Sequence, residues 1–191
     1  MKVLILINKV GLGDCIIHIN YIHEISKKYE KPVSILAKEN TRAKDLFLDD
    51  PHIDEVIILD RLNDNSGHHD GLSGFFKLAK DLREKKFDKV FIFNSSIRYF
   101  LICKFAGIKK IAQYPLFKKK GQHVVNTAKI FTENELNKIV STQPKLIISE
   151  DKILKARKDV SQSHKNIVLA PSASGRTKRW SIKNFIKLIE K

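Results

Sequence analysis

Residues 2–14 read KVLILINKVGLGD, and this stretch decides the fold class of the chain. Its first part, residues 2–8, is an almost continuous apolar run, which is typical of a strand covered by helices on both faces of a sheet. Gly11-Leu12-Gly13-Asp14 then predicts a sharp turn. Apolar residues at helical spacing follow it: Cys15, Ile16, Ile19, Ile22 and Ile25. A strand, a glycine turn and an amphipathic helix in this order open a βαβ unit.

The same alternation continues as far as residue 114. Apolar runs predict four further strands, at 32–37, 54–59, 88–94 and 109–114. Helical spacing predicts helices between them, at 41–48, from Leu72 to Leu82 and at 96–106. A polar stretch at 61–70 predicts a loop. Strands that alternate with helices at this interval predict an α/β fold with a parallel sheet.

Beyond residue 114 the rhythm changes and then restarts. We expect a basic loop at 115–122, a helix at 123–140, a last strand at 144–149 and a Lys-rich helix or linker at 152–163. An apolar run at 166–170, a loop and a helix opened by Ser181 then repeat the pattern of the first residues. We therefore predict three parts: a first domain over 1–149, a linker over 150–165 and the beginning of a second domain over 166–191.

The composition is that of a globular protein with a real core. Of the 191 residues, 42% are hydrophobic and 30% are charged. Cys15 and Cys103 lie in apolar runs, which favours buried thiols in a reducing compartment. No run of roughly 18 apolar residues could span a bilayer, and the first residues lack the pattern of a signal peptide. We expect a cytoplasmic protein.

The positive charge is concentrated in the second half of the chain. The net charge is +15; residues 1–103 hold 16 Lys/Arg and 15 Asp/Glu, whereas residues 104–191 hold 20 and 6. A basic second half of the chain suits an anionic partner: nucleic acid, an acidic membrane surface or phosphorylated small molecules. A compositional bias is the alternative, because Lys outnumbers Arg by 29 to 7.

The Gly11-Leu12-Gly13-Asp14 loop is the first candidate site. It follows a strand and opens a helix, where glycines permit a close approach and the helix terminus offers free N–H groups. It is neither a dinucleotide fingerprint, because Ile16 replaces the third glycine, nor a P-loop, because Gly-Lys-Ser/Thr is absent. Asp14 has two interpretations: an acid that caps the helix, or a general base that takes a proton from a hydroxyl nucleophile.

The second candidate site is the loop within residues 169–185, LAPSASGRTKRWSIKNF. Two serines and three cations stand beside a predicted helix N-terminus, a combination that suits a diphosphate. A solvated, Lys-rich loop is the alternative. Trp180 and Phe185 are interpreted as packing anchors.

The order of these motifs resembles glycosyltransferase family 9, the ADP-heptose:lipopolysaccharide heptosyltransferases and their relatives. The resemblance is carried by the Gly-x-Gly-Asp loop, by Asp50-Pro51-His52-Ile53-Asp54-Glu55-Val56-Ile57, by Phe87-Asp88-Lys89-Val90 and by the Lys178-Arg179-Trp180-Ser181 stretch that leads to Phe185. It implies a GT-B fold with two Rossmann-like domains, so that 1–149 is the acceptor-side domain and 166–191 begins an incomplete donor-binding domain.

The resemblance also implies the chemistry. It implies inverting transfer of a heptose from ADP-heptose to a lipopolysaccharide core or other glycolipid, at the cytoplasmic face of the inner membrane, with no metal and no cofactor. By position, Asp14 matches the catalytic base and Gly13 the glycine beside the acceptor. Ser174 and Lys178 match the groups that hold the donor. Arg98, after the fourth predicted strand, is expected to bind the acceptor, with a surface role as the alternative.

Two departures from the family pattern leave other functions open. The later Asp-Thr-Gly-x-x-His motif has no counterpart, and Asn20 replaces a proline. An inactive remnant is therefore one alternative. The net charge of +15 and Lys178-Arg179-Trp180 suggest another, a basic nucleic-acid-binding protein. No nucleic-acid-binding module is recognisable, so we expect no nucleic acid as a partner. We also expect no metal at His68-His69-Asp70, because adjacent histidines point in different directions.

Overall fold

Five parallel strands form the centre of the first part of the chain. The computed structural model describes residues 1–9, 11–62, 66–115, 123–160, 163–171, 173 and 176–190. It divides into two units, Met1–Ile148 and Ser149–Lys191. The strands of the first unit are β1 (Val3–Ile7), β2 (Val33–Ala37), β3 (Ile53–Ile58), β4 (Lys89–Ile92) and β5 (Lys110–Gln113).

The strand order is β3-β2-β1-β4-β5, as in a Rossmann-like domain. Ile5 of β1 pairs with Ile35 of β2 on one side and with Phe91 of β4 on the other. The predicted parallel α/β fold is thus confirmed. The chain leaves β1 towards β2 and later returns to β4, so a topological switch point lies between β1 and β4. Ligands of such sheets bind outside the carboxyl ends of the strands at this point.

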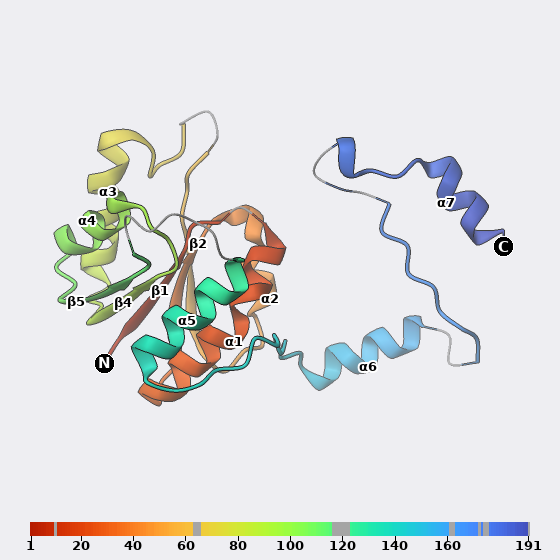
Figure 1. Ribbon diagram of the computed structural model, residues 1–191, viewed down its shortest axis with the longest axis horizontal. Helices are drawn as coiled ribbons and strands as arrows, with labels where there is room; N and C mark the ends of the chain where they lie inside the picture. Colours follow the sequence, from red (N-terminus) through yellow and green to blue (C-terminus); the bar gives the residue numbers. More distant parts are fainter. Residues whose placement is uncertain are drawn as a thin grey trace. The chain divides into compact units, whose positions relative to one another are not determined.

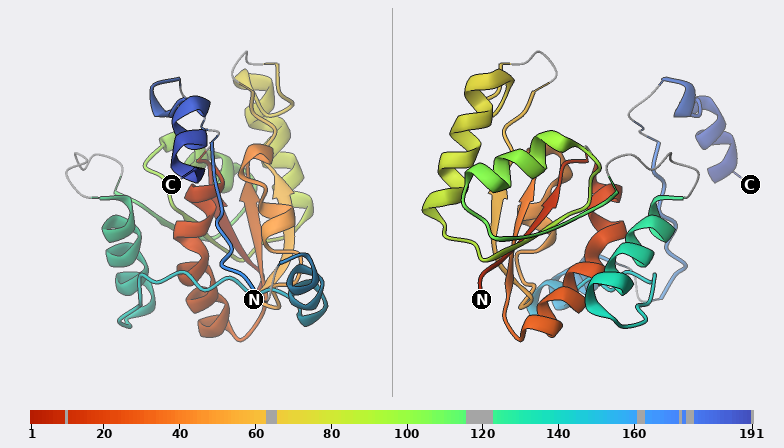
Figure 2. Two further views of the ribbon diagram at one scale, coloured as in Figure 1. Left: turned by 90° about the vertical axis from the view of Figure 1, so that its right-hand side faces the viewer. Right: turned by 60° about the vertical axis from the view of Figure 1, so that its left-hand side comes forward.

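Helices cover both faces of the sheet (Figures 1 and 2). One face carries α1 (Leu12–Tyr29) and α5 (Val124–Leu136), the other α3 (Gly71–Glu84) and α4 (Ile97–Phe105). Alternate residues of β1 supply the two cores: Val3, Ile5 and Ile7 pack with α1 and α5, whereas Leu4 and Leu6 pack with α3 and α4. A short 3₁₀ turn (Glu39–Thr41) and α2 (Ala43–Leu46) connect β2 to β3. Cys15 and Cys103 are both buried free thiols.

The helix α1 shows how local sequence sets an element's limits. It begins after Gly11, whose backbone is extended and whose N–H donates to Asp14 Oδ2 at 3.1 Å. It ends at Glu30, which turns into the left-handed region with φ +52° and closes the helix with its N–H on the last carbonyls. Lys27 and Lys28 in the last turn complement the negative end of the helix dipole.

The second unit contains helices but no sheet in its described residues. These are α6 (Glu150–Asp159), a 3₁₀ turn (Arg176–Lys178) and α7 (Ile182–Ile189), and neither α6 nor α7 has a buried residue. Ser181 opens α7 as expected, with its Oγ accepting from the N–H of Asn184. No helix in the described residues is both long and apolar enough to cross a membrane.

Two predicted strands are absent. The structure assigns no strand to residues 144–149 or 166–170, all of which it describes. Both runs are apolar enough, but neither has a neighbouring strand to receive its backbone hydrogen bonds, and a strand is defined by that pairing. The predicted basic loop at 115–122 lies, apart from Pro115, outside the described residues.

Candidate functional site

Two asparagines meet at the switch point of the sheet. Asn8 follows β1 and Asn94 follows β4, and the Asn94 side-chain amide donates to Asn8 Oδ1 at 2.7 Å. Asn94 Oδ1 also accepts from the N–H of Ser96 at 2.6 Å. Gln113, at the end of β5, donates to the carbonyls of Asn94 and Ser96. These amides join the carboxyl ends of three strands into one polar edge.

The loop with Gly13 and Asp14 lies at the same edge, because it connects β1 to α1. Asp14 is half-buried, and one of its carboxylate oxygens accepts the Gly11 N–H that fixes the start of the helix. Gly13 is exposed, and a Cβ placed on it would meet no atom within 4 Å. The capping role of Asp14 is thus present, and open space for a ligand lies beside it.

His18 is a residue that the sequence analysis missed. It lies one turn after Asp14, is 1% exposed, and its Nδ1–H donates to the Asp14 carbonyl oxygen at 2.6 Å. Burial lowers the pKa of His18, so the ring is neutral at pH 7. Its Nε2 is then a buried acceptor without a partner among the described residues. A single polar residue at helical spacing from Asp14, on an otherwise apolar face, was the available signal.

Phe93 separates His18 from a second buried polar atom. The Phe93 ring centroid lies 4.9 Å from that of His18 and 5.7 Å from that of Tyr114. The hydroxyl of Tyr114 is buried and has no partner in the described part of the chain. Burial raises the pKa of Tyr114, so the hydroxyl stays protonated. The side chains packed beneath the polar edge of the sheet are therefore largely aromatic.

Beside it, a hollow opens at the carboxyl ends of β2 and β3. It has a volume of about 470 Å³ and is lined by residues of both signs, among them Lys38, Arg42, Asp45, Asp60 and Arg61. Arg42 and Asp45 form an exposed ion pair at 2.7 Å. The mixed lining suits a polar ligand rather than an apolar one.

Asp70 holds the loop that borders this hollow. Its carboxylate accepts from Arg61 Nε at 2.9 Å, from the N–H of Leu62 at 2.9 Å and from the N–H of Gly67 at 3.0 Å. These bonds hold the pKa of Asp70 below its usual range, and the bond from Arg61 has the largest effect. The loop has no room for a side chain at Gly67, where a Cβ would lie 2.7 Å from the Asp60 carbonyl oxygen.

Arg98 contacts the backbone at the start of α3. Its Nη2 donates to the carbonyl oxygens of His69 and Gly71, at 3.0 and 2.8 Å. These bonds fix the end of the loop that Asp70 organises. Acceptor binding by Arg98 stays a prediction, and the contacts support an action through this loop.

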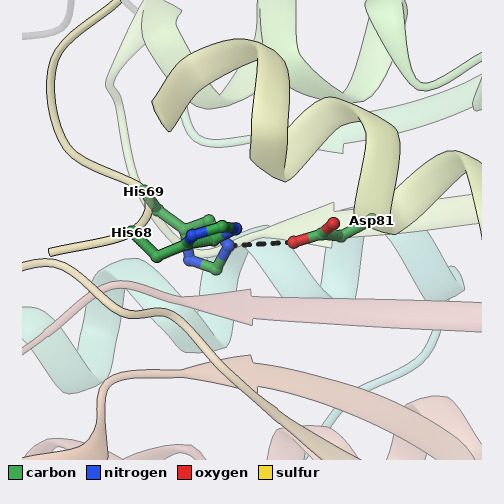
Figure 3. A group of neighbouring side chains, drawn as sticks. All are labelled: His68, His69 and Asp81. Carbon is green, nitrogen blue, oxygen red and sulfur yellow. Dashed lines mark hydrogen bonds and ion pairs between the residues drawn. The ribbon is translucent and has the colours of Figure 1, made fainter. Parts of the chain in front are cut away.

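A cluster of possible metal ligands is formed by His68, His69 and Asp81 (Figure 3). The separation of Asp81 from the two histidines along the sequence did not indicate this. One ligand atom from each lies within 4.8 Å of the others. His69 Nδ1 accepts the Asp60 N–H at 3.0 Å, so the neutral ring carries its proton on Nε2, which faces Asp81 Oδ2 at 3.0 Å. A metal would need that nitrogen bare. The cluster therefore fits a hydrogen-bonded brace between the loop and α3 better than a metal centre.

In the second unit, Lys178 ends the 3₁₀ turn and is exposed. Arg179 Nε donates to the Ala173 carbonyl at 2.8 Å, which ties the loop to itself. The rings of Trp180 and Phe185 pack with centroids 5.0 Å apart, so these residues anchor the loop on α7 as expected. Ser174 lies outside the described residues.

Comparisons with known proteins point to one family. The sequence model described as "Glycosyltransferase family 9 (heptosyltransferase)" matches residues 75–191. Among curated protein sequences the chain has no match.

Several solved structures of bacterial proteins have a similar fold. E. coli ADP-heptose lps heptosyltransferase II is similar over 100% of the chain, with 20% identity and a TM-score of 0.67, and the match covers 60% of that protein. A glycosyl transferase family 9 protein from Veillonella parvula is similar over 98%, with 16% identity, a TM-score of 0.66 and 58% of its own length covered. E. coli heptosyltransferase WaaC with ADP has 12% identity, a TM-score of 0.60 and 64% covered. The chain thus spans about 60% of the length of the first of these proteins, and at such identities the likeness shows the fold alone.

Proposed function

The chain belongs to glycosyltransferase family 9, and from this premise we propose that it carries the acceptor side of a heptosyltransferase. The matching family model covers more than half of the chain. The reaction would move a heptose from a nucleotide diphosphate to an acceptor hydroxyl, with inversion at the anomeric carbon. Two structures of E. coli heptosyltransferase WaaC hold ADP or ADP-2-deoxy-2-fluoro heptose, which favours ADP-heptose as the donor of this protein.

In this proposal Asp14 is the general base. It would take the proton from the acceptor hydroxyl while that oxygen attacks the anomeric carbon, and the bond from that carbon to the diphosphate breaks. The observation that carries the proposal is the position of Asp14: a half-buried carboxylate at the switch point, next to open space at Gly13. His18 supports the geometry, because its bond to the Asp14 carbonyl stiffens the first turn of α1.

The donor would be held by the second unit. We assign residues 1–149 to the acceptor-side domain, 150–165 to a linker and 166–191 to the beginning of the donor-binding domain. Ser174 and Lys178 would bind the diphosphate, with the Lys178 ammonium neutralising charge on the leaving group. An exposed lysine in a loop directly before a helix N-terminus supports this assignment.

The acceptor would be a lipopolysaccharide core sugar or another glycolipid, presented at the cytoplasmic face of the inner membrane. The polar hollow of about 470 Å³ at the carboxyl ends of β2 and β3 offers room for sugar hydroxyls at the same edge of the sheet as the Asp14 loop. Arg98 would contribute by holding the backbone at His69 and Gly71. No step of this scheme requires a metal or a cofactor.

Transfer can be tested in a chimaera. Residues 1–191 would be continued by the part of E. coli heptosyltransferase II that lies beyond the match. A mass increase of one heptose on a heptose-free lipopolysaccharide core, with ADP-heptose but not with UDP-glucose, is the expected result. A chimaera that unfolds cooperatively and binds ADP-heptose, yet transfers nothing, would contradict the proposal. Salt-dependent retention of RNA oligomers without saturable donor binding would favour a nucleic-acid-binding protein.

A further inference from the structure

Large apolar side chains gather on the outer surface of α3 and α4. We define the α3/α4 patch as Leu72, Phe76, Leu101 and Phe105, which are between 39% and 81% exposed. Leu72 lies one turn before Phe76, and Leu101 one turn before Phe105. The rings of Phe76 and Phe105 are 6.0 Å apart, and Phe75 contacts both, at 5.1 and 5.5 Å. The residues therefore form one surface and are not scattered singly.

Cations surround this patch. Lys77, Lys80 and Arg83 lie on the exposed side of α3, and Lys104 on that of α4. Within the described part of the chain, none of these four pairs with a carboxylate; Arg83 donates instead to the Phe105 carbonyl. Past the ends of the two helices, a hollow of about 560 Å³ is lined by Arg83, Lys86, Lys109 and Lys110 together with Asp88. The basic surface thus continues from the patch into this hollow.

The opposite face of the sheet is different. The helices α1 and α5 together carry three Lys/Arg and four Asp/Glu, whereas α3 and α4 carry five and two. Of the three lysines on α1 and α5, two are paired, Lys27 with Glu24 at 2.8 Å and Lys129 with Glu133 at 3.6 Å, and only Lys28 has no carboxylate partner among the described residues. Unpaired positive charge next to exposed apolar residues is therefore concentrated on the α3/α4 face.

From this contrast we infer that the α3/α4 patch and the cations around it dock on an anionic phospholipid bilayer. Aromatic and aliphatic side chains enter the boundary between headgroups and acyl chains, while lysines remain among the anionic headgroups. Leu72 and Leu101 favour a bilayer over nucleic acid, because aliphatic side chains have no stacking partner there. The mixture of exposed cations with apolar residues also differs from a protein interface, whose centre is depleted of charge.

The placement of the patch suits a membrane-bound acceptor. Since α3 and α4 follow the parallel strands β3 and β4, both begin near the carboxyl edge of the sheet, where the loop of Asp14 lies. A bilayer against this face would bring the sugar of a glycolipid to that edge. This consequence rests on the proposed function, whereas the docking itself rests on the surface alone.

Vesicle flotation tests the inference with the 191-residue chain. Vesicles of phosphatidylcholine with about one third phosphatidylglycerol should retain the protein, and pure phosphatidylcholine should not. Each cation near the surface strengthens binding about fivefold, so Lys80→Gln with Lys104→Gln should weaken it by about tenfold or more. Phe76→Gln with Phe105→Gln should have a similar effect. Raising the salt concentration to about 0.5 M should weaken binding of the native chain.

Matched controls keep the test specific. Lys28→Gln with Lys31→Gln removes two exposed lysines elsewhere, and Ile130→Gln removes a half-exposed apolar side chain from α5; both should bind as the native chain does. Circular dichroism would verify that each variant is folded. Equal loss in the controls, equal binding to neutral vesicles, or unchanged binding of the Phe76/Phe105 variant would overturn the inference.

Two further outcomes would also overturn it: a dimer that dissociates on Phe76→Gln, or displacement from vesicles by RNA. Flotation is independent of transfer. If the chimaera fails with a soluble, deacylated acceptor while the native chain still binds anionic vesicles, the proposed function fails and the docking surface stands. If the chimaera transfers heptose but the native chain does not bind anionic vesicles, the docking surface fails and the proposed function stands.

Discussion

The strand β1 and the stretch 166–170 are two apolar runs with opposite outcomes. Each precedes a loop of small residues and a helix. All five residues of β1 are buried between β2 and β4 and beneath two helical layers. In the second stretch, Ile167 and Val168 are 80% and 91% exposed, and the structure assigns no strand. Both runs are largely apolar, but among the described residues only β1 has neighbouring strands.

The helices behave differently from the strands. In α7 each backbone hydrogen bond is made within the helix, and Ser181 caps its first turn. It therefore forms although its apolar residues stay exposed, among them Ile182, Ile186 and Ile189. A strand has no such local alternative, because its hydrogen bonds go to other strands. Local sequence thus suffices for a helix in the second unit, whereas a strand requires the rest of a sheet.

The largest expected effect is on the turnover number, and it comes from Asp14 in the loop that follows β1. In the chimaera, Asp14→Asn should lower the turnover number by roughly 10²–10⁴, because Asn cannot take the proton. Stability should change little, since Asn also serves well near a helix start. Turnover measured by mass spectrometry, together with thermal unfolding, checks both. Near-normal turnover would leave Asp14 only its bond to the Gly11 N–H.

The two runs themselves can be compared by one matched substitution. Ile5→Ala, at a fully buried position, should cost about 2–5 kcal/mol of the free energy of unfolding. Ile167→Ala, at an exposed position, should change it by less than about 0.5 kcal/mol. Urea unfolding monitored by circular dichroism measures both in the 191-residue chain. A large loss at Ile167 would reveal a buried environment in solution and would break the comparison.

Asp50, His23 and His52 form a largely buried polar cluster in the first unit. Its response to acid extends the comparison between buried and exposed positions. Burial raises the pKa of Asp50, but bonds from His23 Nε2 at 2.6 Å and from the His52 N–H at 3.0 Å bring it, on balance, below its usual range. The unfolded chain then binds a proton more readily than the folded chain. Stability that is present above the usual Asp range of about 4 is therefore lost as the pH falls through the lower folded value.

His52 acts in the same direction at a higher pH. Burial, and then the neighbouring His23, lower the pKa of His52, so stability already starts to fall as the pH drops below about 6.5. Asp50→Ala should cost about 1–3 kcal/mol at pH 7 and flatten the acid limb below about pH 4. Asp45→Ala, in an exposed ion pair, should cost less than about 1 kcal/mol. Unfolding curves between pH 3 and pH 8 test both; a loss of stability below about pH 4 that survives Asp50→Ala would exclude Asp50 as its source, whereas the His52 contribution below about pH 6.5 should remain.

The smallest expected effect lies in the second unit. The 191-residue chain should bind ADP, GDP and pyrophosphate weakly and with similar affinity, because charge-assisted contacts there lack a closed, low-dielectric site. Lys178→Ala should weaken this binding by about tenfold, and Lys183→Ala on α7 should leave it unchanged. Calorimetry at two salt concentrations measures it. Tight binding selective for adenine would show that the donor site is elsewhere.

The sequence predicted most of the first unit because its signals are local or repeated. Continuous apolar runs identified the five strands, and glycine turns with helical spacing identified the crossovers. The predicted strands at 144–149 and 166–170 failed for the opposite reason, since pairing depends on residues far away in the chain. The Asn8–Asn94 bond, the Asp70 carboxylate within its loop and the approach of Asp81 to His69 arise from tertiary contacts. No spacing along the sequence indicates them.

The central position of β1 has a consequence for synthesis on the ribosome. Residues 3–7 are made before the other strands of the sheet and can pair with β2 early, but their other neighbour, β4, consists of residues 89–92. At roughly 5–20 residues per second, this edge of β1 stays unpaired for several seconds. An unpaired apolar edge is a template for association with other chains. The stretch VLILI, which is completely buried in the finished sheet, is thus a nascent segment that needs a chaperone until β4 emerges.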